Sequence, residues 1–264
     1  LQRKGAVMCS IFGIFDIKEQ SAQLRQVALE NSRLQLHRGP DWEGIYQGKN
    51  AIIVHERLSI VDPQNGAQPL YNENKTHILA VNGEIYNHKQ LRQELTVDYD
   101  FKTGSDCEVI LPLYEEFKRT GKNFVDRLVG DFAFVIYDEE DNTIFAARDH
   151  MGINPMYVGT DSEGRFYIAS EMKALVKICD SVKEFPPRHY IYSKGGDYSF
   201  KQYYTRDWKD YENVKNDTAD VSILKEGLMD AVRRQLMCDV PYGVLLSGGL
   251  DSSVISAIAK FYSE

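Results

Sequence analysis

The 264-residue chain has only four cysteines, at positions 9, 107, 179 and 238. They form no CxxC pair and no cluster with histidine, which argues against a zinc site or a disulfide-rich scaffold and favours a reduced, cytoplasmic location. Long hydrophobic runs are also missing, and stretches such as residues 132–137 are far too short to span a bilayer. Positive charge is in deficit, with 31 basic and 39 acidic residues and a net charge of −8. The sequence therefore predicts neither a membrane nor a nucleic-acid partner.

What the chain does contain is a series of short β-rich runs with few helices between them. A buried strand is expected at residues 11–16 and a helix at 21–36, where apolar residues recur at helical spacing. Further strands are expected at 51–54, 77–81, 132–137, 143–147, 155–158 and 166–169, and helices at 108–120 and 123–128. This order predicts an α+β domain in which two stacked sheets are flanked by helices.

The pattern changes near residue 195. Residues 201–220 show neither apolar period and are expected to form a linker. After it come a helix at 223–236, a strand at 242–246, a glycine-rich turn and a helix at 252–262, an order that opens a parallel α/β domain. A parallel sheet needs several such units and residues 221–264 supply one, so we expect the second domain to be incomplete in this chain.

Cys9 stands directly after Met8 and opens an apolar run. Residues 1–8 match no pattern in the rest of the chain and are expected to be an N-terminal extension, either a tag remnant or upstream sequence. If Cys9 becomes the first residue, its α-amine can take the thiol proton, which makes a nucleophile with a built-in base. If residues 1–8 stay attached, an amide nitrogen replaces that base. The alternative is a small buried strand cysteine.

Several polar residues at strand and helix ends could carry chemistry. Arg57 offers a rigid fork suited to a carboxylate. The Asn82-Gly83-Glu84 sequence places an amide, a backbone N–H and a carboxylate at one strand end, and Asp106 adds a second acid near a helix start. Each feature alone is ordinary, since Asn-Gly is often a hairpin turn and aspartate often caps a helix. Together, after a candidate N-terminal cysteine, they indicate a site.

The glycine-rich turn Ser247-Gly248-Gly249-Leu250-Asp251-Ser252-Ser253 lies between an expected strand and an expected helix. Such a turn lets backbone N–H groups approach a phosphate, and the helix N-terminus adds further donors. The lysine of the nucleotide-hydrolase P-loop is missing. The string instead resembles the pyrophosphate-binding loop of the ATP pyrophosphatases.

With these motifs in place, the chain from Cys9 onward resembles the class II glutamine amidotransferases, which are N-terminal nucleophile hydrolases. Among them it is most similar to the glutamine-hydrolysing asparagine synthetases of the bacterial B type. The motifs that carry the resemblance are CSIFG at 9–13, HRGPD at 37–41, RLSIVD at 57–62, NGEIYN at 82–87, GSD at 104–106, RDHMG at 148–152, SEMKAL at 170–175 and VPYGVLLSGG at 240–249. The resemblance implies a four-layer αββα sandwich over residues 9–200.

The resemblance also implies roles for the candidate residues. Cys9 would attack the side-chain amide of glutamine, and Asn82 and Gly83 would stabilise the oxyanion. Arg57 would hold the α-carboxylate of glutamine, while Glu84 and Asp106 would hold its α-ammonium. Main-chain groups at Leu58, Ile60 and Val61 would complete the glutamine site. No cofactor is expected in this domain.

For the second domain the resemblance implies a synthetase that uses ammonia, ATP and aspartate to make asparagine, AMP and pyrophosphate. The expected ATP-binding residues are Leu246, Ser247, Gly248, Gly249, Asp251 and Ser252, with Asp251 as a magnesium ligand. The competing hypothesis is a catalytically silent glutamine-binding or interaction module, which applies if Cys9 is not the free N-terminus. A homodimer is a candidate assembly.

Overall fold

The computed structural model describes residues 8–194, 196–218 and 220–263. All of the expected extension at residues 1–8 except Met8 therefore lies outside the described residues. The chain divides into two units, one ending at Tyr204 and the other beginning at Thr205. Each unit is described by itself.

In chain order, with η for a 3-10 helix, the elements of the first unit are β1 (Ser10–Phe15), α1 (Ala22–Arg33), β2 (Trp42–Gln47), β3 (Ile52–Arg57), β4 (Leu70–Tyr71), β5 (His77–Ile85), α2 (His88–Glu94), η1 (Asp106–Val109), α3 (Ile110–Thr120), η2 (Val125–Arg127), β6 (Gly130–Asp138), β7 (Thr143–Arg148), β8 (Tyr157–Thr160), β9 (Phe166–Ala169), η3 (Met172–Ala174), β10 (Ser181–Glu184), β11 (His189–Lys194) and β12 (Phe200–Gln202). Their strands form two six-stranded sheets within the described residues, and every strand pairing is antiparallel. Sheet A has the order β10-β8-β9-β1-β3-β2, and sheet B has the order β12-β11-β7-β6-β5-β4.

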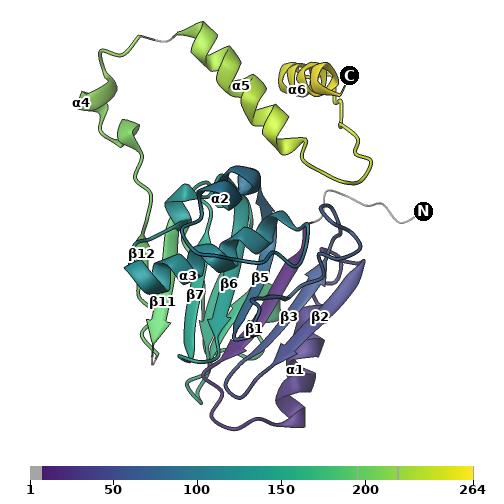
Figure 1. Cartoon of the computed structure of the whole chain (residues 1–264), viewed down its shortest axis with the longest axis vertical. Helices are drawn as coiled ribbons and strands as arrows, with labels where there is room; N and C mark the ends of the chain where they lie inside the picture. Colours follow the sequence, from purple (N-terminus) through teal and green to yellow (C-terminus); the bar gives the residue numbers. More distant parts are fainter. Residues whose placement is uncertain (1–7, 195, 219, 264) are drawn as a thin grey trace. The chain divides into compact units, whose positions relative to one another are not determined.

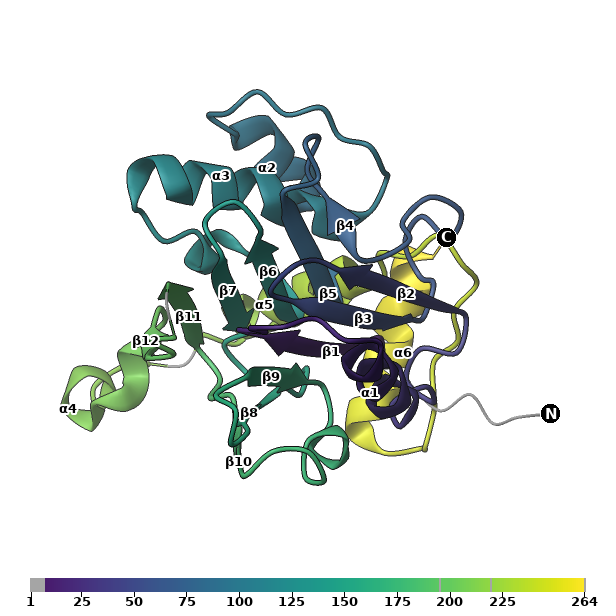
Figure 2. The ribbon, with the colours of Figure 1, turned by 90° about the horizontal axis from the view of Figure 1, so that it is seen from below.

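The two sheets stack face to face and helices cover their outer faces. Figure 2 shows α2 and α3 on the far side of sheet B and α1 on the far side of sheet A, and Figure 1 shows the same elements from the side. The first unit is thus a four-layer αββα sandwich, and this part of the fold prediction is confirmed.

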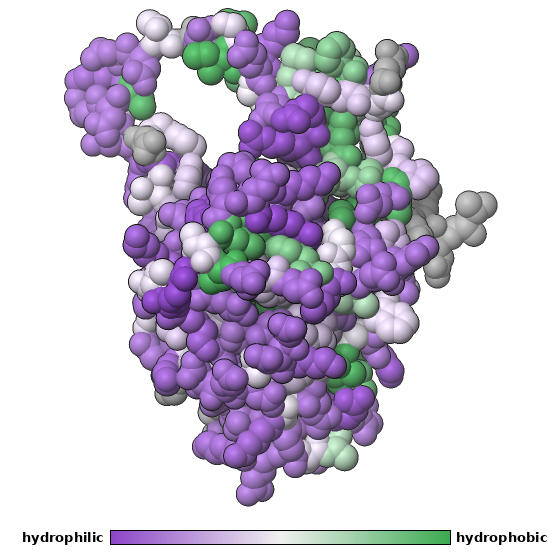
Figure 3. All heavy atoms as spheres, in the orientation of Figure 1, coloured by the Kyte–Doolittle hydropathy of each residue, from purple (hydrophilic) through white to green (hydrophobic). Residues whose placement is uncertain are grey.

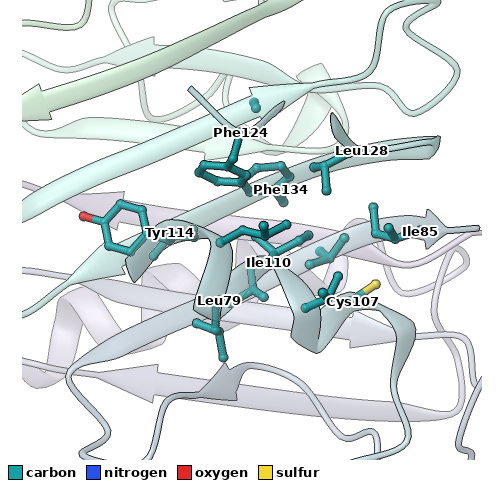
Figure 4. Packing of buried hydrophobic residues seen from close by; sticks show 14 of the residues in the cluster. Leu79, Ile85, Cys107, Ile110, Tyr114, Phe124, Leu128 and Phe134 are labelled. Carbon is teal, nitrogen blue, oxygen red and sulfur yellow. The ribbon is translucent and has the colours of Figure 1, made fainter. Parts of the chain in front are cut away.

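Apolar side chains fill all three spaces between these layers. One cluster lies between the sheets and includes Ile11 and Phe15 of β1. A second lies under α1 and includes Phe12 and Ile14 of the same strand. Because β1 is buried on both faces, it reads in the sequence as an uninterrupted apolar run. The third cluster packs α3 on sheet B, with Tyr114 among its members (Figure 4).

The expected elements of this unit are present, with changes at their edges. Helix α1 begins after Ser21, whose hydroxyl accepts a hydrogen bond from the Leu24 N–H at 3.1 Å. The helix expected at 108–120 is η1 followed by α3, and it ends at Gly121 with φ 69°. The expected helix at 123–128 is only the 3-10 turn η2. Strands β2, β4, β10, β11 and β12 and helix α2 are not predicted from the sequence.

The second unit consists of η4 (Asp207–Lys209), α4 (Tyr211–Val214), α5 (Val221–Gln235) and α6 (Leu250–Tyr262). The expected linker, 201–220, therefore includes the end of β12 and two short helices. Both longer helices are as predicted, but the strand predicted at 242–246 is wrong. No strand occurs among the described residues of this unit, so the segment has no partner for its backbone groups.

Apolar side chains remain exposed in the second unit. Leu245 and Leu250 are 90% and 80% exposed. Hydrophobic surface over α6 and the segment before it is visible in Figure 3. In the part of the chain that the structure describes, no helix has the length and apolar character needed to cross a membrane.

Candidate active site

Cys9 lies immediately before β1, where the chain enters sheet A. Its Sγ accepts a hydrogen bond from the Leu58 N–H at 3.3 Å and lies 3.5 Å from the Leu58 carbonyl oxygen. Burial raises the pKa of the Cys9 thiol to about 11, although the Leu58 N–H and the charge of Arg57 act to lower it. At pH 7 only about one thiol in 10⁴ would then be ionised, so nucleophilic attack by Cys9 requires a base.

Arg57 ends β3, and its side chain is buried against the loop that follows. One terminal guanidinium nitrogen donates to the Val61 carbonyl at 3.1 Å and the Asp62 carbonyl at 2.7 Å, and the other donates to the Pro63 carbonyl at 3.2 Å. These three carbonyls fix the guanidinium in one orientation. A fixed, planar cation is well suited to bind a carboxylate through two hydrogen bonds.

Asn82 and Gly83 lie in β5 of sheet B. Asn82 is fully buried, and neither its amide nitrogen nor its amide oxygen has a hydrogen-bond partner among the described residues. An unpaired buried amide costs about 1–3 kcal/mol, so its persistence points to a ligand. Gly83 has φ 140°, and a Cβ there would lie 2.0 Å from the Asp131 carbonyl oxygen. Glycine is required at this position.

Two carboxylates complete the charged groups, Glu84 on β5 and Asp106 at the start of η1. Burial, together with the charges of Asp106 and Asp131, raises the pKa of Glu84 to about 7. Burial also raises the pKa of Asp106, although its carboxylate accepts the Ile85 N–H at 2.6 Å. Ionising both groups without a counter-charge is unfavourable, and a bound ammonium would relieve that cost.

Most of these residues line one narrow cleft with a volume of about 30 Å³. Its lining residues are Met8, Cys9, Arg57, Leu58, Ile60, Val61, Gly66, Gln68, Gly83, Glu84, Ser105, Asp106 and Cys107. Among the predicted glutamine-site residues, Asn82 is not part of this lining; its buried side chain lies one residue before Gly83.

The cleft also contains residues that sequence reasoning misses: Met8, Gly66, Gln68, Ser105 and Cys107. Ser105 and Cys107 flank Asp106, so their nearness to a predicted residue is a signal that could have found them. Gln68 precedes Pro69, and nothing in the local sequence marks it.

The predicted ATP-binding residues belong to the second unit, where they surround the start of α6. Gly249 precedes the helix, and Gly248 has φ 84°. The hydroxyl oxygens of Ser247 and Ser252 are 2.9 Å apart, and Asp251 lies in the first turn. Leu246, just before this turn, is 64% exposed. Among the residues described, no group of three or more His, Cys, Asp or Glu side chains could hold a metal ion.

The αββα sandwich and the sequence together define a class of protein. The profile of the glutamine amidotransferase domain matches residues 8–193, and the chain belongs to this family. A glutamine phosphoribosylpyrophosphate amidotransferase from B. subtilis has a TM-score of 0.58 at 20% identity, covering 96% of this chain and 64% of that one. This likeness shows the fold, which is that of the N-terminal nucleophile hydrolases.

Within that class, the relatives of this chain are glutamine-hydrolysing asparagine synthetases, as its motifs predict. It is 59% identical to asparagine synthetase B of Escherichia coli (strain K12) over 256 residues, which are 97% of this chain and 45% of the relative. A probable asparagine synthetase of Dictyostelium discoideum is 46% identical over 263 residues, 97% of this chain and 46% of that one. The asparagine synthase profile matches residues 224–264. The chain spans about half the length of these relatives.

Proposed function

We propose that residues 9–200 hydrolyse glutamine to glutamate and ammonia, as the amide-donating part of a glutamine-hydrolysing asparagine synthetase. The observation that carries this proposal is the cleft, in which Cys9 lies beside a fixed guanidinium and two carboxylates. Free glutamine bears one α-carboxylate and one α-ammonium, so its charges complement those of the cleft. Glutamine inside a peptide bears neither charge and would not be held in this way.

In this mechanism Arg57 holds the α-carboxylate, and Glu84 and Asp106 hold the α-ammonium. The side-chain amide carbon is then presented to Cys9. As the Sγ–C bond forms, the thiol proton passes to the α-amine of Cys9, and the negative charge on the amide oxygen is stabilised by the Asn82 side chain and the Gly83 N–H. Loss of one such donor typically costs ~10²–10³ in rate.

The tetrahedral intermediate then collapses. The amine returns the proton to the departing nitrogen, ammonia leaves as the C–N bond breaks, and a γ-glutamyl thioester remains on Cys9. Water adds to the thioester carbonyl and glutamate is released with the thiol restored. Nucleophile and base both come from Cys9, so we propose no cofactor for this half.

Met8 determines whether this mechanism can operate. It lines the cleft, and its peptide bond turns the Cys9 nitrogen into an amide that is not a usable base. Uncleaved, the chain corresponds to the silent glutamine-binding module. We therefore propose that the active form begins at Cys9.

The test compares one preparation before and after a site-specific protease removes residues 1–8, with each N-terminus confirmed by intact mass. Glutamate release should rise by at least the ~10²–10⁴ associated with a general base. The processed Cys9→Ala protein is the control and should stay inactive. Equal activity before and after cleavage would mean that another group deprotonates Cys9.

For the second unit we propose ATP binding at Leu246, Ser247, Gly248, Gly249, Asp251 and Ser252, with aspartate as the acceptor of ammonia in the complete enzyme. One carboxylate with nearby hydroxyls fits magnesium, which commonly uses one or two carboxylates plus substrate phosphates. Asp251 would hold that ion, which would neutralise phosphate charge. We further propose that the protein is cytoplasmic and forms a homodimer. Light scattering of the purified protein tests the homodimer.

A further inference from the structure

Strand β5 pairs with β6 along its whole length, but its pairing with β4 on the other side ends just before the candidate active site. Strand β4 pairs with β5 only through Leu70 opposite Leu79 and Tyr71 opposite Ile78. At Val81, two residues beyond Leu79, side chains form hydrogen bonds with the β5 backbone in place of β4. Its N–H donates to Gln68 Oε1 at 2.7 Å, and its carbonyl lies 2.8 Å from His55 Nε2. A carbonyl can only accept, so His55 Nε2 carries the hydrogen.

His55 connects the two sheets at this point. It lies on β3, in sheet A, on the same face as Ile53, whose side chain belongs to the core between the sheets. Two residues later on that face is Arg57. Val81 lies on β5, in sheet B, and is followed directly by Asn82. One hydrogen bond thus joins the sheet that carries Cys9 and Arg57 to the peptide group between Val81 and Asn82.

The environment of His55 suits a fixed, neutral donor. The side chain is fully buried, and its Nδ1 has no hydrogen-bond partner among the described residues. Burial, with the nearby charge of Arg57, lowers the pKa of His55 to about 4, so the imidazole is neutral at physiological pH. Its hydrogen bond to Val81 is therefore insensitive to pH above about 5.

We propose that His55 is a positioning residue, which fixes the peptide group before Asn82 and thereby aligns the Asn82 amide with the oxyanion. This inference rests on the proposed glutaminase function. The Asn82 side chain has no partner of its own among the described residues, so its placement depends on the backbone that carries it. The Gln68 side chain also supports Val81, because it accepts the hydrogen bond from the Val81 N–H.

The kinetic consequence follows from when the Asn82 amide acts. An oxyanion donor matters in the transition state and hardly in the bound substrate, so a misplaced amide lowers kcat and leaves KM nearly unchanged. For processed His55→Leu, which loses the donor, we expect kcat to fall about 10- to 100-fold and KM to change less than about 3-fold. His55→Gln keeps an N–H at a similar reach and should recover most of the rate.

Binding of an aldehyde analogue of glutamine separates alignment from general damage. The Cys9 thiol adds across the C=O bond, with its proton passing to the oxygen, and that oxygen occupies the oxyanion position. His55→Leu should weaken binding of the aldehyde by the same factor as kcat, while binding of glutamate changes less than about 3-fold. His77→Leu is the matched control. His77 is also a buried histidine and lies in β5, but its Nε2 lies 3.4 Å from Asp138 Oδ2 and the residue does not line the cleft.

Each result decides the matter. Normal kcat and aldehyde binding in His55→Leu overturn the inference while the proposed function stands, and so does an equal loss of kcat in His77→Leu. If the processed wild-type protein hydrolyses no glutamine, the proposed function and this inference fail together. If His55→Leu does not fold, His55→Gln and His55→Asn replace it; the shorter amide should lose rate, and equal rates in the two refute the positioning role.

Discussion

Replacing Glu84 by glutamine should change stability and ligand binding in opposite directions. In the ligand-free cleft, partial burial and the charges of Asp106 and Asp131 raise the pKa of Glu84 to about 7. Glu84→Gln removes a charge that is unfavourable in the empty site. The same charge is proposed to bind the α-ammonium of glutamine, so its loss weakens binding.

The size of the stability effect follows from the pKa difference. A rise from 4.5 to about 7 corresponds to an upper limit of about 3 kcal/mol at 1.36 kcal/mol per pH unit. Because Glu84 is partly exposed, solvent screens the charge, and we expect about 1–2 kcal/mol. The folded state holds the proton more tightly, so the cost is absent below pH 4.5, grows between pH 4.5 and 7, and is complete above pH 7.

Urea unfolding of wild-type protein and Glu84→Gln at pH 5 and pH 8 measures this effect. The variant should be more stable at pH 8, and its advantage should be much smaller at pH 5. Glu19→Gln, the same change at an exposed glutamate, is the control and should differ little from wild type at either pH.

Calorimetry in a processed Cys9→Ala background measures glutamine binding without turnover. Loss of a charged hydrogen bond worth about 1.5–3 kcal/mol should raise Kd roughly 10- to 100-fold at pH 8. In the Cys9→Ala protein that keeps Glu84, the Kd for glutamine should rise as pH falls below 7. The Cys9→Ala protein that also carries Glu84→Gln should lose that dependence. If Glu84→Gln is less stable than wild type at pH 8, or binds glutamine equally well, the assignment of Glu84 to the ammonium is wrong.

Two further substitutions test the cleft. Arg57→Lys should raise KM for glutamine more than it lowers kcat, because a point charge cannot replace a bidentate fork; steady-state kinetics that leave KM unchanged would remove Arg57 from the site. Gly83→Ala should lower the free energy of unfolding by at least about 3 kcal/mol and abolish hydrolysis, since strain at φ 140° adds to a Cβ contact of 2.0 Å. Gly164→Ala, with φ 79° and no atom within 4 Å, should cost only about 1 kcal/mol; equal losses would refute the steric argument.

How well the sequence predicts the fold depends on how deeply each segment is buried. Strands such as β1 and β6 are covered on both faces, so their apolar runs stand out. Strand β2 is an edge strand with half-exposed or exposed side chains, and α2 buries only His88 and Leu91, so neither shows a clear period. The predicted strand at 242–246 has the right residues, but a strand also needs a neighbour to pair with, which local sequence cannot reveal.

The sequence likewise reveals some parts of the candidate site and not others. Cys9, Arg57, Glu84 and Asp106 are polar residues at the ends of regular elements, where motifs are easily seen. The hydrogen bond from His55 to Val81 joins residues 26 positions apart in the sequence, and the one from Val81 to Gln68 joins residues 13 positions apart. Neither contact follows from the sequence around either partner, because the first depends on how the two sheets stack and the second on how the segment before β4 lies beside β5.

The side chains between the two sheets change in size and polarity toward the candidate site. At the far end, the space between the sheets is filled by large rings, and those of Phe15 and Tyr137 have centroids 6.1 Å apart. Toward Asn82 the inward residues of β5 and β6 become small, as with Ala80 and Ala133, and Ala133 is paired with Asn82. At this end the inward side chains of β3 and β5 also become polar, since His55 and Arg57 follow Ile53 on one strand and Asn82 follows Ala80 on the other. The candidate site therefore lies where polar side chains replace the apolar ones that fill the rest of the space between the sheets.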